Sequence, residues 1–217
     1  LIDILKVLGR KEYIWLDLVN NDLEKIISDT IKLETINLDL NGTMDLAKML
    51  ASIIDFRSPF TAVHSIGVAK TAEKMAELIG YSENQRKMML VAGYLHDLGK
   101  LAIPNEIMEK PDKLNKDEQN IMRTHTYHTY HMLKHIKPLK EINMWASLHH
   151  EKLNGTGYPF KLKAKDIPLG SRIVAVADVF TAIKEERPYR SGMNRARTLE
   201  VLNSMVEGGA ICPSVTA

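Results

Sequence analysis

Apolar residues recur at intervals of three and four along almost the whole 217-residue chain, and this spacing restricts the fold more than any other feature. Ile2, Leu5 and Leu8 show the pattern near the start, and later segments repeat it. A helix of 3.6 residues per turn gathers such residues on one buried face. No alternation of the kind that a strand needs extends beyond a few residues. The sequence therefore predicts an all-α protein, built as a helical bundle.

Glycine and proline divide this pattern into separate helices. We expect helices at 44–55, 61–79, 83–98, 116–136, 140–150 and 169–183, followed by a short terminal helix. Gly80 is expected to cap the second of them in the left-handed conformation, and Gly99 to stop the third. Asn41-Gly42 is read as a turn. It marks the predicted boundary between an N-terminal helical segment over 1–42 and a domain over 43–217.

Composition excludes several classes of protein. Hydrophobic residues make up 45% and charged residues 26%, and the formal net charge is +2, which indicates neither a duplex nucleic-acid partner nor a membrane-binding surface. No run approaches 18 apolar residues, so no membrane span is expected. Cys212 is the single cysteine, which excludes an internal disulfide and favours a cytoplasmic location. We read the chain as a piece of a longer protein, with its domain truncated at the C-terminus. The longer protein is left free to carry a sensor or membrane region.

Two apolar helices carry polar residues at positions expected to be buried. Asp178 lies in RIVAVADVFTAI at 172–183, and an ionised carboxylate there must be paired or bound to a metal. A buried salt bridge or a helix cap is the alternative. MLVAGYLHDLGK at 89–100 brings His96 and Asp97 together, about 100° apart on a helix. They can bind one metal jointly, or the carboxylate can bridge two, whereas a hydrogen-bonded core histidine is the alternative for His96.

Histidine number and placement strengthen the metal interpretation. The chain has eight histidines and none in its first 63 residues. They fall on several expected helices, which is how a bundle converges ligands on one core site. Imidazole and carboxylate without thiolate suit iron, manganese, zinc or nickel. The number of ligands favours two metal ions, a common arrangement for phosphoester hydrolysis.

Four of the histidines share one expected helix and cannot all reach one point. His125 and His135 would be about 15 Å apart along it, at 1.5 Å per residue. At least two of the four are therefore expected at the surface, and we assign no role to His128 or His131.

Five stretches together resemble the HD-GYP family, a branch of the HD metal-dependent phosphohydrolases. They are RSPFTAVHS at 57–65, HDLGKLAIP at 96–104, HTYHTYHML at 125–133, HHEKLNGTGYP at 149–159 and RIVAVADVFTAIKEERPYR at 172–190. The resemblance covers roughly 45–213. It implies an HD-domain helical bundle with a dinuclear metal site in its core. The activity implied is that of a bacterial phosphodiesterase that hydrolyses cyclic di-GMP to linear pGpG, and some members act on cyclic GMP-AMP.

The resemblance also implies a role for individual residues. The implied metal ligands are His64, His96, Asp97, His125, His149, His150 and Asp178. Asp97 would bridge the two ions, with iron or manganese favoured and zinc, nickel or magnesium as alternatives. Lys100 would contact the scissile phosphate and offset charge in the transition state. Arg187 and Arg190 would hold the other phosphate as guanidinium forks, and Tyr158 would bind substrate at the cleft mouth, with a purely structural turn as the alternative.

Three positions in and around these motifs lead to further expectations. Phe60 stands where members with a third metal have glutamate, so two metals and a less efficient cleavage of pGpG to GMP are expected. Asn154 replaces the usual aspartate before Gly157, and an Asx turn forms with either residue. Glu151 is expected to act as an acceptor for a ligand or as a neighbouring cap.

The expected partners follow from the same resemblance. They are a cyclic dinucleotide substrate, a diguanylate cyclase domain at the Gly157-Tyr158-Pro159 loop, and a second copy in a homodimer. Residues 1–42 would serve as a linker, a signalling helix, a dimer contact or the end of a sensor region. Two other functions stay open: a different HD phosphohydrolase such as a nucleotidase, and a metal-holding signalling module without turnover.

Overall fold

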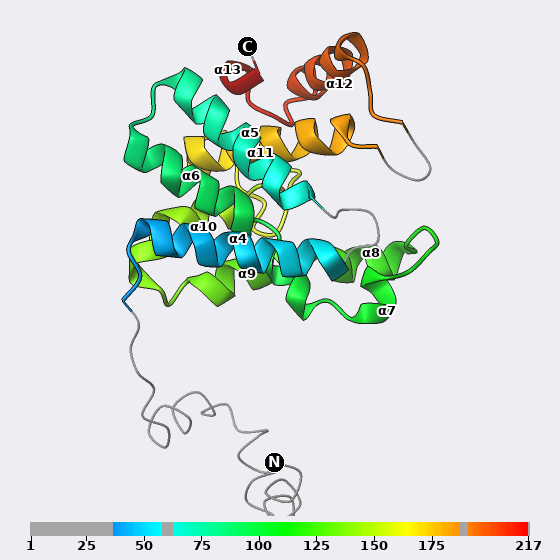
Figure 1. Ribbon diagram of the computed structural model, residues 1–217. Helices are drawn as coiled ribbons and strands as arrows, with labels where there is room; N and C mark the ends of the chain where they lie inside the picture. The colour runs from blue at the N-terminus through cyan, green and yellow to red at the C-terminus, as the bar shows by residue number, and fades with distance from the viewer. Residues whose placement is uncertain (1–36, 58–62, 187–190, 217) are drawn as a thin grey trace, which may run out of the picture. The chain divides into compact units, whose positions relative to one another are not determined.

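The structure, a computed structural model, describes residues 37–57, 63–186 and 191–216 (Figure 1). These residues contain helices and no strand, so the all-α prediction is confirmed. The longer helices are α4 (Leu40–Arg57), α5 (His64–Ile79), α6 (Glu83–Leu95), α8 (Lys116–Arg123), α9 (His125–Leu133), α10 (Lys140–Ser147), α11 (Leu169–Lys184) and α12 (Arg195–Glu207). Short helices are η1 (Leu98–Ala102), α7 (Asn105–Met108), η2 (Lys137–Leu139), η3 (Ala164–Asp166) and α13 (Pro213–Thr216). The division of the chain at residue 42 stays a prediction, because residues 1–36 lie outside the described part.

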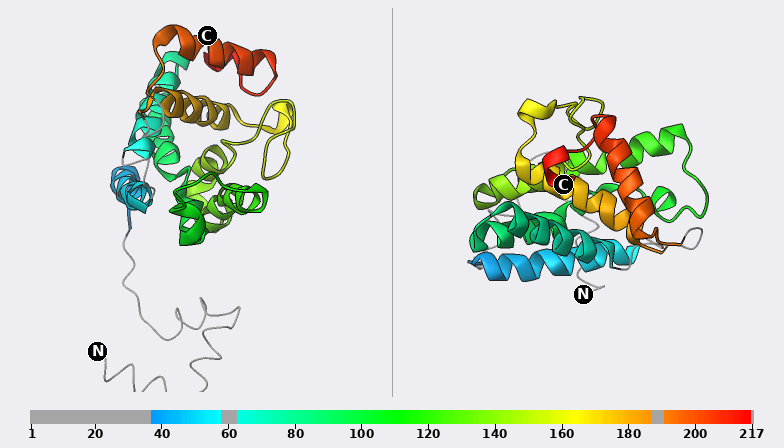
Figure 2. Two further views of the ribbon diagram at one scale, coloured as in Figure 1. Left: turned by 90° about the vertical axis from the view of Figure 1, so that its right-hand side faces the viewer. Right: turned by 90° about the horizontal axis from the view of Figure 1, so that it is seen from above.

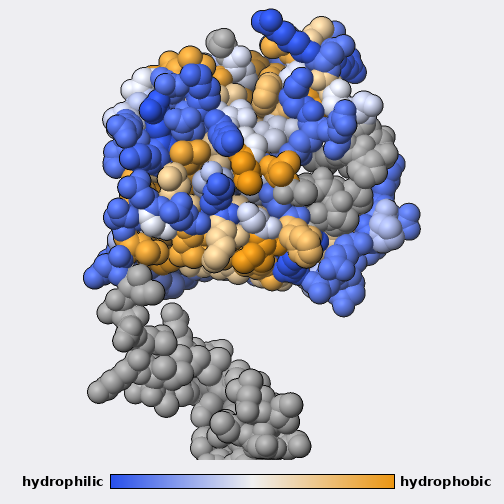
Figure 3. Space-filling model, viewed as in Figure 1, coloured by the Kyte–Doolittle hydropathy of each residue, from blue (hydrophilic) through white to orange (hydrophobic). Residues whose placement is uncertain are grey.

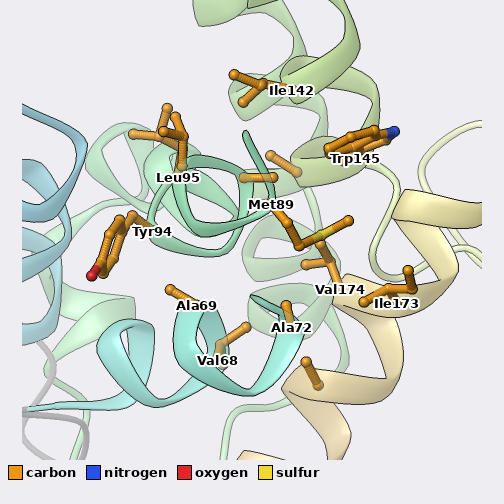
Figure 4. Close-up of a cluster of buried hydrophobic side chains, with 14 of the residues drawn as sticks. Val68, Ala69, Ala72, Met89, Tyr94, Leu95, Ile142, Trp145, Ile173 and Val174 are labelled. Carbon is orange, nitrogen blue, oxygen red and sulfur yellow. The ribbon is translucent and has the colours of Figure 1, made fainter. Parts of the chain in front are cut away.

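The core is formed where α5, α6, α10 and α11 meet. Figure 4 shows Val68 and Ala72 of α5, Met89 of α6 and Val174 of α11 gathered in one place, with Trp145 of α10 in the same cluster. All five side chains are at most 3% exposed. Small residues on α5 let α6 and α11 pack closely on either side of it, which positions the ends of these helices relative to one another.

The remaining helices enclose this core. Helix α4 packs on α6 and α5, whereas α10 contacts α6, α9 and α11. Figures 1 and 2 show α12 and α13 beyond α11, on the side of the bundle away from α4. Helix α9 lies against η1, and this contact joins two of the predicted ligand motifs.

Of two predictions about helix boundaries, the one at Gly80 was right and the one at Asn41-Gly42 was wrong. Gly80 caps α5 with φ 95°, as expected. Asn41-Gly42 is not a turn: both residues lie in the first turn of α4. The carboxylate of Asp39 accepts a hydrogen bond from the Gly42 backbone N–H at 2.8 Å, and this cap starts the helix before the Asn-Gly pair.

The expected helix over 116–136 is two helices that are interrupted at Thr124. Thr124 Oγ1 donates to the Ile121 carbonyl at 2.6 Å, and His125 Nδ1 donates to the Met122 carbonyl at 2.7 Å. Side chains that bind carbonyls three residues back compete with the helical hydrogen bonds and end α8. His125 therefore begins a new helix, α9, which holds His128 and His131 and ends at Leu133, so that His135 lies beyond it. Likewise, α6 ends at Leu95, so His96 and Asp97 lie in a turn.

One face of α4 is apolar and exposed. Leu46, Met49, Ile53 and Phe56 recur at helical spacing along it, and Phe56 is 89% exposed. Figure 3 shows this row of apolar side chains along the lower edge of the bundle. Such a row favours contact with other apolar surface. The expected homodimer stays a prediction.

Among the described helices, none combines the length and the apolar character that crossing a membrane requires.

Candidate metal centre

Three histidines are oriented by the same local hydrogen bond. In each, Nδ1 lies at hydrogen-bond distance from the backbone carbonyl three residues earlier: His96 with Gly93 at 2.8 Å, His125 with Met122 at 2.7 Å and His149 with Ala146 at 2.7 Å. A carbonyl can only accept, so Nδ1 carries a proton in each ring, and Nε2 of His125 and of His149 is left without a hydrogen-bond partner among the described residues. This is the second contact that metal-binding histidines usually make.

The histidine rings converge although they come from different elements. The His149 ring centroid lies 4.8 Å from that of His96, 5.5 Å from that of His125 and 4.1 Å from that of His150. The centroid of His64, at the start of α5, lies 5.7 Å from that of His96. Turns after α6 and α10 and the starts of α5 and α9 therefore deliver imidazoles to one place.

Asp97 lies in the middle of this cluster and is 3% exposed. Its Oδ2 lies 3.2 Å from His96 Nε2 and 2.6 Å from Lys100 Nζ, and its Oδ1 lies 3.4 Å from His125 Nε2. Burial acts to raise the pKa of the Asp97 carboxyl, but the charges of His96 and Lys100 outweigh it and hold that pKa well below its usual range. Asp97 is therefore a carboxylate whose two oxygens face different sides of the cluster.

His64, Asp178 and Glu185 form the other side of the cluster. His64 Nε2 lies 3.1 Å from Asp178 Oδ1, and its Nδ1 lies 3.0 Å from Glu185 Oε2. Burial opposes the charged form, yet these two carboxylates raise the pKa of His64 to about 10. The Asp178 side chain is 14% exposed rather than fully buried as expected.

Glu185 is a residue that the sequence analysis missed. It follows Asp178 by seven residues, which is two helical turns, so both side chains lie on one face of α11 and its end. That spacing from a buried acid was the available signal.

The residues present fit a bound metal. Nε2 of His125 and of His149 is buried, and within the described part of the chain neither atom has a hydrogen-bond partner. Leaving such an atom unsatisfied costs about 1–3 kcal/mol, and a cation would remove that cost. Ligand atoms lie within 4.8 Å of one another in three sets: His125, His149 and His150; His64, His96 and Asp178; and His96, Asp97 and His149. All seven predicted ligand side chains are thus brought into one cluster.

Protonation states on the His125 side also suit metal binding. Burial lowers the pKa of His125 to about 3, and it lowers the pKa values of His149 and His150 as well. These rings are therefore neutral near neutral pH, and the neutral imidazole is the form that binds a cation. His64 and His96 differ, because burial is outweighed by neighbouring carboxylates, which raise the pKa of each ring, so each has to lose a proton before it binds a cation.

Comparison with known proteins agrees with this geometry. A family model described as "HD domain" matches residues 48–213. The chain belongs to the HD domain family. It is 33% identical over 214 residues to the "3'3'-cGAMP-specific phosphodiesterase 1" of Vibrio cholerae, covering 97% of this chain and 49% of that protein. It is 37% identical over 155 residues to the "Cyclic di-GMP phosphodiesterase response regulator RpfG" of Xanthomonas campestris, covering 70% and 41%.

A solved structure of a phosphodiesterase also resembles this chain. The crystal structure of a cyclic GMP-AMP specific phosphodiesterase of V. cholerae superposes with a TM-score of 0.58 and 26% identity, covering 99% of this chain and 49% of that one. The resemblance to HD-GYP phosphodiesterases is confirmed. The HD-domain chain spans less than half the length of each of these three relatives.

The Gly-Tyr-Pro loop of the HD domain is held by its own hydrogen bonds. The buried Glu151 carboxylate accepts from the backbone N–H of Phe160 at 2.7 Å and of Leu162 at 3.0 Å. Asn154 Oδ1 accepts from the Thr156 N–H at 3.0 Å, which confirms the expected Asx turn. Glu151 therefore anchors the loop, and Tyr158 stacks on His150 with ring centroids 4.9 Å apart.

Other predicted residues lie elsewhere or outside the description. Arg187, Arg190 and Phe60 are outside the described residues. His131 packs on Tyr127 with ring centroids 4.1 Å apart, and His128 also neighbours Tyr127. Within the described residues neither His128, His131 nor His135 belongs to a group that could hold a metal ion.

His128 provides a test of this division along α9. His128→Ala should leave metal content and turnover within about twofold of the parent, because its ring does not reach the cluster. His125→Ala, three residues earlier on the same helix, should lose metal. Metal analysis of the two purified variants gives the comparison. If His128→Ala lost metal and His125→Ala kept it, we would have chosen the wrong histidine.

Thr129 links the two motifs that α9 and η1 carry. Its hydroxyl accepts from the Gly99 N–H at 2.8 Å and donates to the His96 carbonyl at 3.2 Å, and it is fully buried. Gly99 itself lies so close to α9 that an added Cβ would be 1.9 Å from the His125 carbonyl oxygen. The hydroxyl therefore fixes the turn that carries His96 and Asp97.

Thr129→Val should lower the free energy of unfolding by about 2 kcal/mol, since it leaves a buried N–H and a buried carbonyl without partners at nearly constant volume. Urea denaturation measures this. Thr71→Val on α5 is the control, because no side-chain hydrogen bond of Thr71 is seen within the described residues. Equal stability of both variants would show that the Thr129 hydroxyl contributes nothing.

Proposed function

We propose that this HD domain is a metal-dependent phosphodiesterase that hydrolyses a cyclic dinucleotide. The observation that carries the proposal is the buried cluster in which two unpartnered imidazole nitrogens, a central carboxylate and a lysine meet. Membership of the HD domain family and the names of the relatives support the same activity.

In this proposal, seven side chains hold two divalent metal ions. They are His64, His96, Asp97, His125, His149, His150 and Asp178. Such ions, when bound, stabilise negative charge on phosphoryl oxygens and make a water acidic enough to attack phosphorus near neutral pH. Asp97 holds both halves of the cluster together, because each of its oxygens faces a different histidine. Iron and manganese are favoured, and the ligand types also accept zinc or nickel.

Lys100 is the residue of this chain that acts on the substrate phosphate. Its ammonium group donates to Asp97 Oδ2, and its side chain is 21% exposed, so it is fixed by the cluster and still open to a bound ligand. An ammonium held there in advance can offset charge that develops on a phosphoryl oxygen. Tyr158 stacks over His150 and forms one wall of the same site.

Cyclic di-GMP, with pGpG as its product, is the substrate that the motif resemblance implies. Cyclic GMP-AMP is the second candidate, and one observation favours it: the relative aligned over 97% of this chain is named as specific for that nucleotide. Both substrates have two phosphodiester links, and the proposed cluster would cleave either by the same chemistry.

The decisive experiment is anaerobic turnover of the two cyclic dinucleotides by protein loaded with Fe(II) or Mn(II), with chromatographic separation of the products. We expect a linear dinucleotide from at least one substrate, and the ratio of kcat/KM identifies the preferred one. If the protein binds metal but cleaves neither, the alternative of a signalling module without turnover is favoured. The expected contact with a diguanylate cyclase domain and the cytoplasmic location stay predictions.

A further inference from the structure

We propose that Arg123 binds a phosphate group of the substrate at the rim of the metal cluster, an inference that rests on the proposed function. Arg123 is not among the residues for which the sequence predicts a role. It is the last residue of α8 and lies two positions before His125. Only Thr124 separates α8 from α9, so the Arg123 backbone is held close to the predicted metal ligand His125.

The Arg123 side chain extends over the Gly-Tyr-Pro loop. Its guanidinium carbon lies 4.4 Å from the centroid of the Tyr158 ring, and Tyr158 in turn stacks on His150 at 4.9 Å. The Tyr158 ring therefore lies between the Arg123 guanidinium and His150, a predicted metal ligand. A guanidinium binds an aromatic ring through its face and a phosphate through the N–H groups along its edge. Arg123 can therefore keep its contact with Tyr158 while it donates to an anion.

The charge of Arg123 is not neutralised by the protein around it. Across the ranges that the structure describes, no carboxylate forms an ion pair with Arg123, whose side chain is exposed. Glu118, on the same helix, pairs with Lys110 at 2.7 Å. Lys100 at the cluster is paired with Asp97. An unpaired guanidinium beside the proposed site is therefore available to a substrate that carries two negative phosphodiester groups.

A packing role is the competing explanation, and the loop itself argues against it. Glu151 already holds the loop through two backbone N–H groups, and the Tyr158 N–H donates to the His150 carbonyl at 3.2 Å. Tyr158 therefore does not need Arg123 to fix the backbone that carries it. Arg123 covers the Tyr158 ring, and in addition it brings a positive charge to this place.

Arg123→Met separates charge from packing, because methionine is long enough to cover the Tyr158 ring. For the cyclic dinucleotide, we expect KM to rise about tenfold and kcat to stay within about threefold, since a bond to a group that does not react contributes to binding. Turnover of bis(p-nitrophenyl) phosphate should not change, because this small diester occupies the metal cluster without reaching the rim. Arg123→Lys should recover most of the affinity. Arg197→Met, on the exposed face of α12, is the matched control.

Two results would overturn the inference. One is an unchanged KM in Arg123→Met. The other is an equal loss on both substrates together with a lower melting temperature in the Met and Lys variants, which would show a packing role. Failure of the proposed function is visible separately, as metal-loaded parent protein that cleaves bis(p-nitrophenyl) phosphate but no cyclic dinucleotide. In that case, equilibrium binding of the cyclic dinucleotide decides: about tenfold weaker binding by Arg123→Met supports the phosphate contact, and equal binding removes it.

Discussion

Asp97→Asn should abolish nearly all turnover and lower the bound metal from two ions to one or none. The substitution keeps the shape of the side chain, but it removes the charge that both halves of the cluster share through Oδ1 and Oδ2. We expect a loss of at least about 1,000-fold in kcat, because both stabilisation of charge and activation of water depend on the ions. Metal analysis and turnover of the same preparation measure the two effects together.

Asp166→Asn is the control for this experiment, since Asp166 is an exposed aspartate in η3. It should retain parent metal content and rate. If Asp97→Asn bound two ions as tightly as the parent, Asp97 would not be the bridging ligand. Circular dichroism excludes unfolding as the cause of a loss, because the helical signal should be unchanged.

Lys100→Met should lower kcat about 100-fold while the metal content holds, which is the usual cost of removing one group that stabilises charge in a transition state. Its ammonium group contacts Asp97 but does not itself offer a ligand atom. We expect kcat and kcat/KM to fall together, since the contact is strongest in the transition state. Stopped assays with the cyclic dinucleotide, beside metal analysis, measure both.

Lys165→Met, at an exposed lysine of η3, is the matched control and should behave like the parent. Two outcomes would refute the role of Lys100. A parent-like rate would remove it from the reaction. Loss of metal in proportion to the loss of rate would show that it acts only by holding Asp97.

The fold class could be predicted from the sequence because it depends on residue type and spacing, whereas the members of the cluster were predicted from the resemblance of five motifs to the HD-GYP family. Helical periodicity is a property of 3.6 residues per turn, and it holds over most of the described chain. Asp178 stood out because a carboxylate among apolar residues needs a partner, and the structure gives it His64. The ligand roles of the cluster residues remain predictions.

Features that depend on contacts between distant segments could not be predicted. The interruption at Thr124 arises from side chains that bind carbonyls three residues back. The sequence shows which residues are present, but it does not show that their side chains bind these carbonyls. The support from Thr129 to Gly99 joins α9 to η1 across 30 residues. Asp55 of α4 accepts hydrogen bonds from both the N–H and the hydroxyl of Ser65 at the start of α5, beside His64. A single sequence contains no signal for such pairs.

The hydrogen bond from each imidazole to the carbonyl three residues before it determines how the ring is held before a metal binds. His96, His125 and His149 are each oriented within a four-residue stretch of their own backbone. Each stretch and its ring therefore form one stiff arm, with the proton already on the nitrogen that faces away from the cluster. Loading a metal then requires no tautomer exchange in these three arms. The separation of two ions bound in this cluster would accordingly be governed by how the arms are spaced, which is a property of helix packing rather than of rotamers.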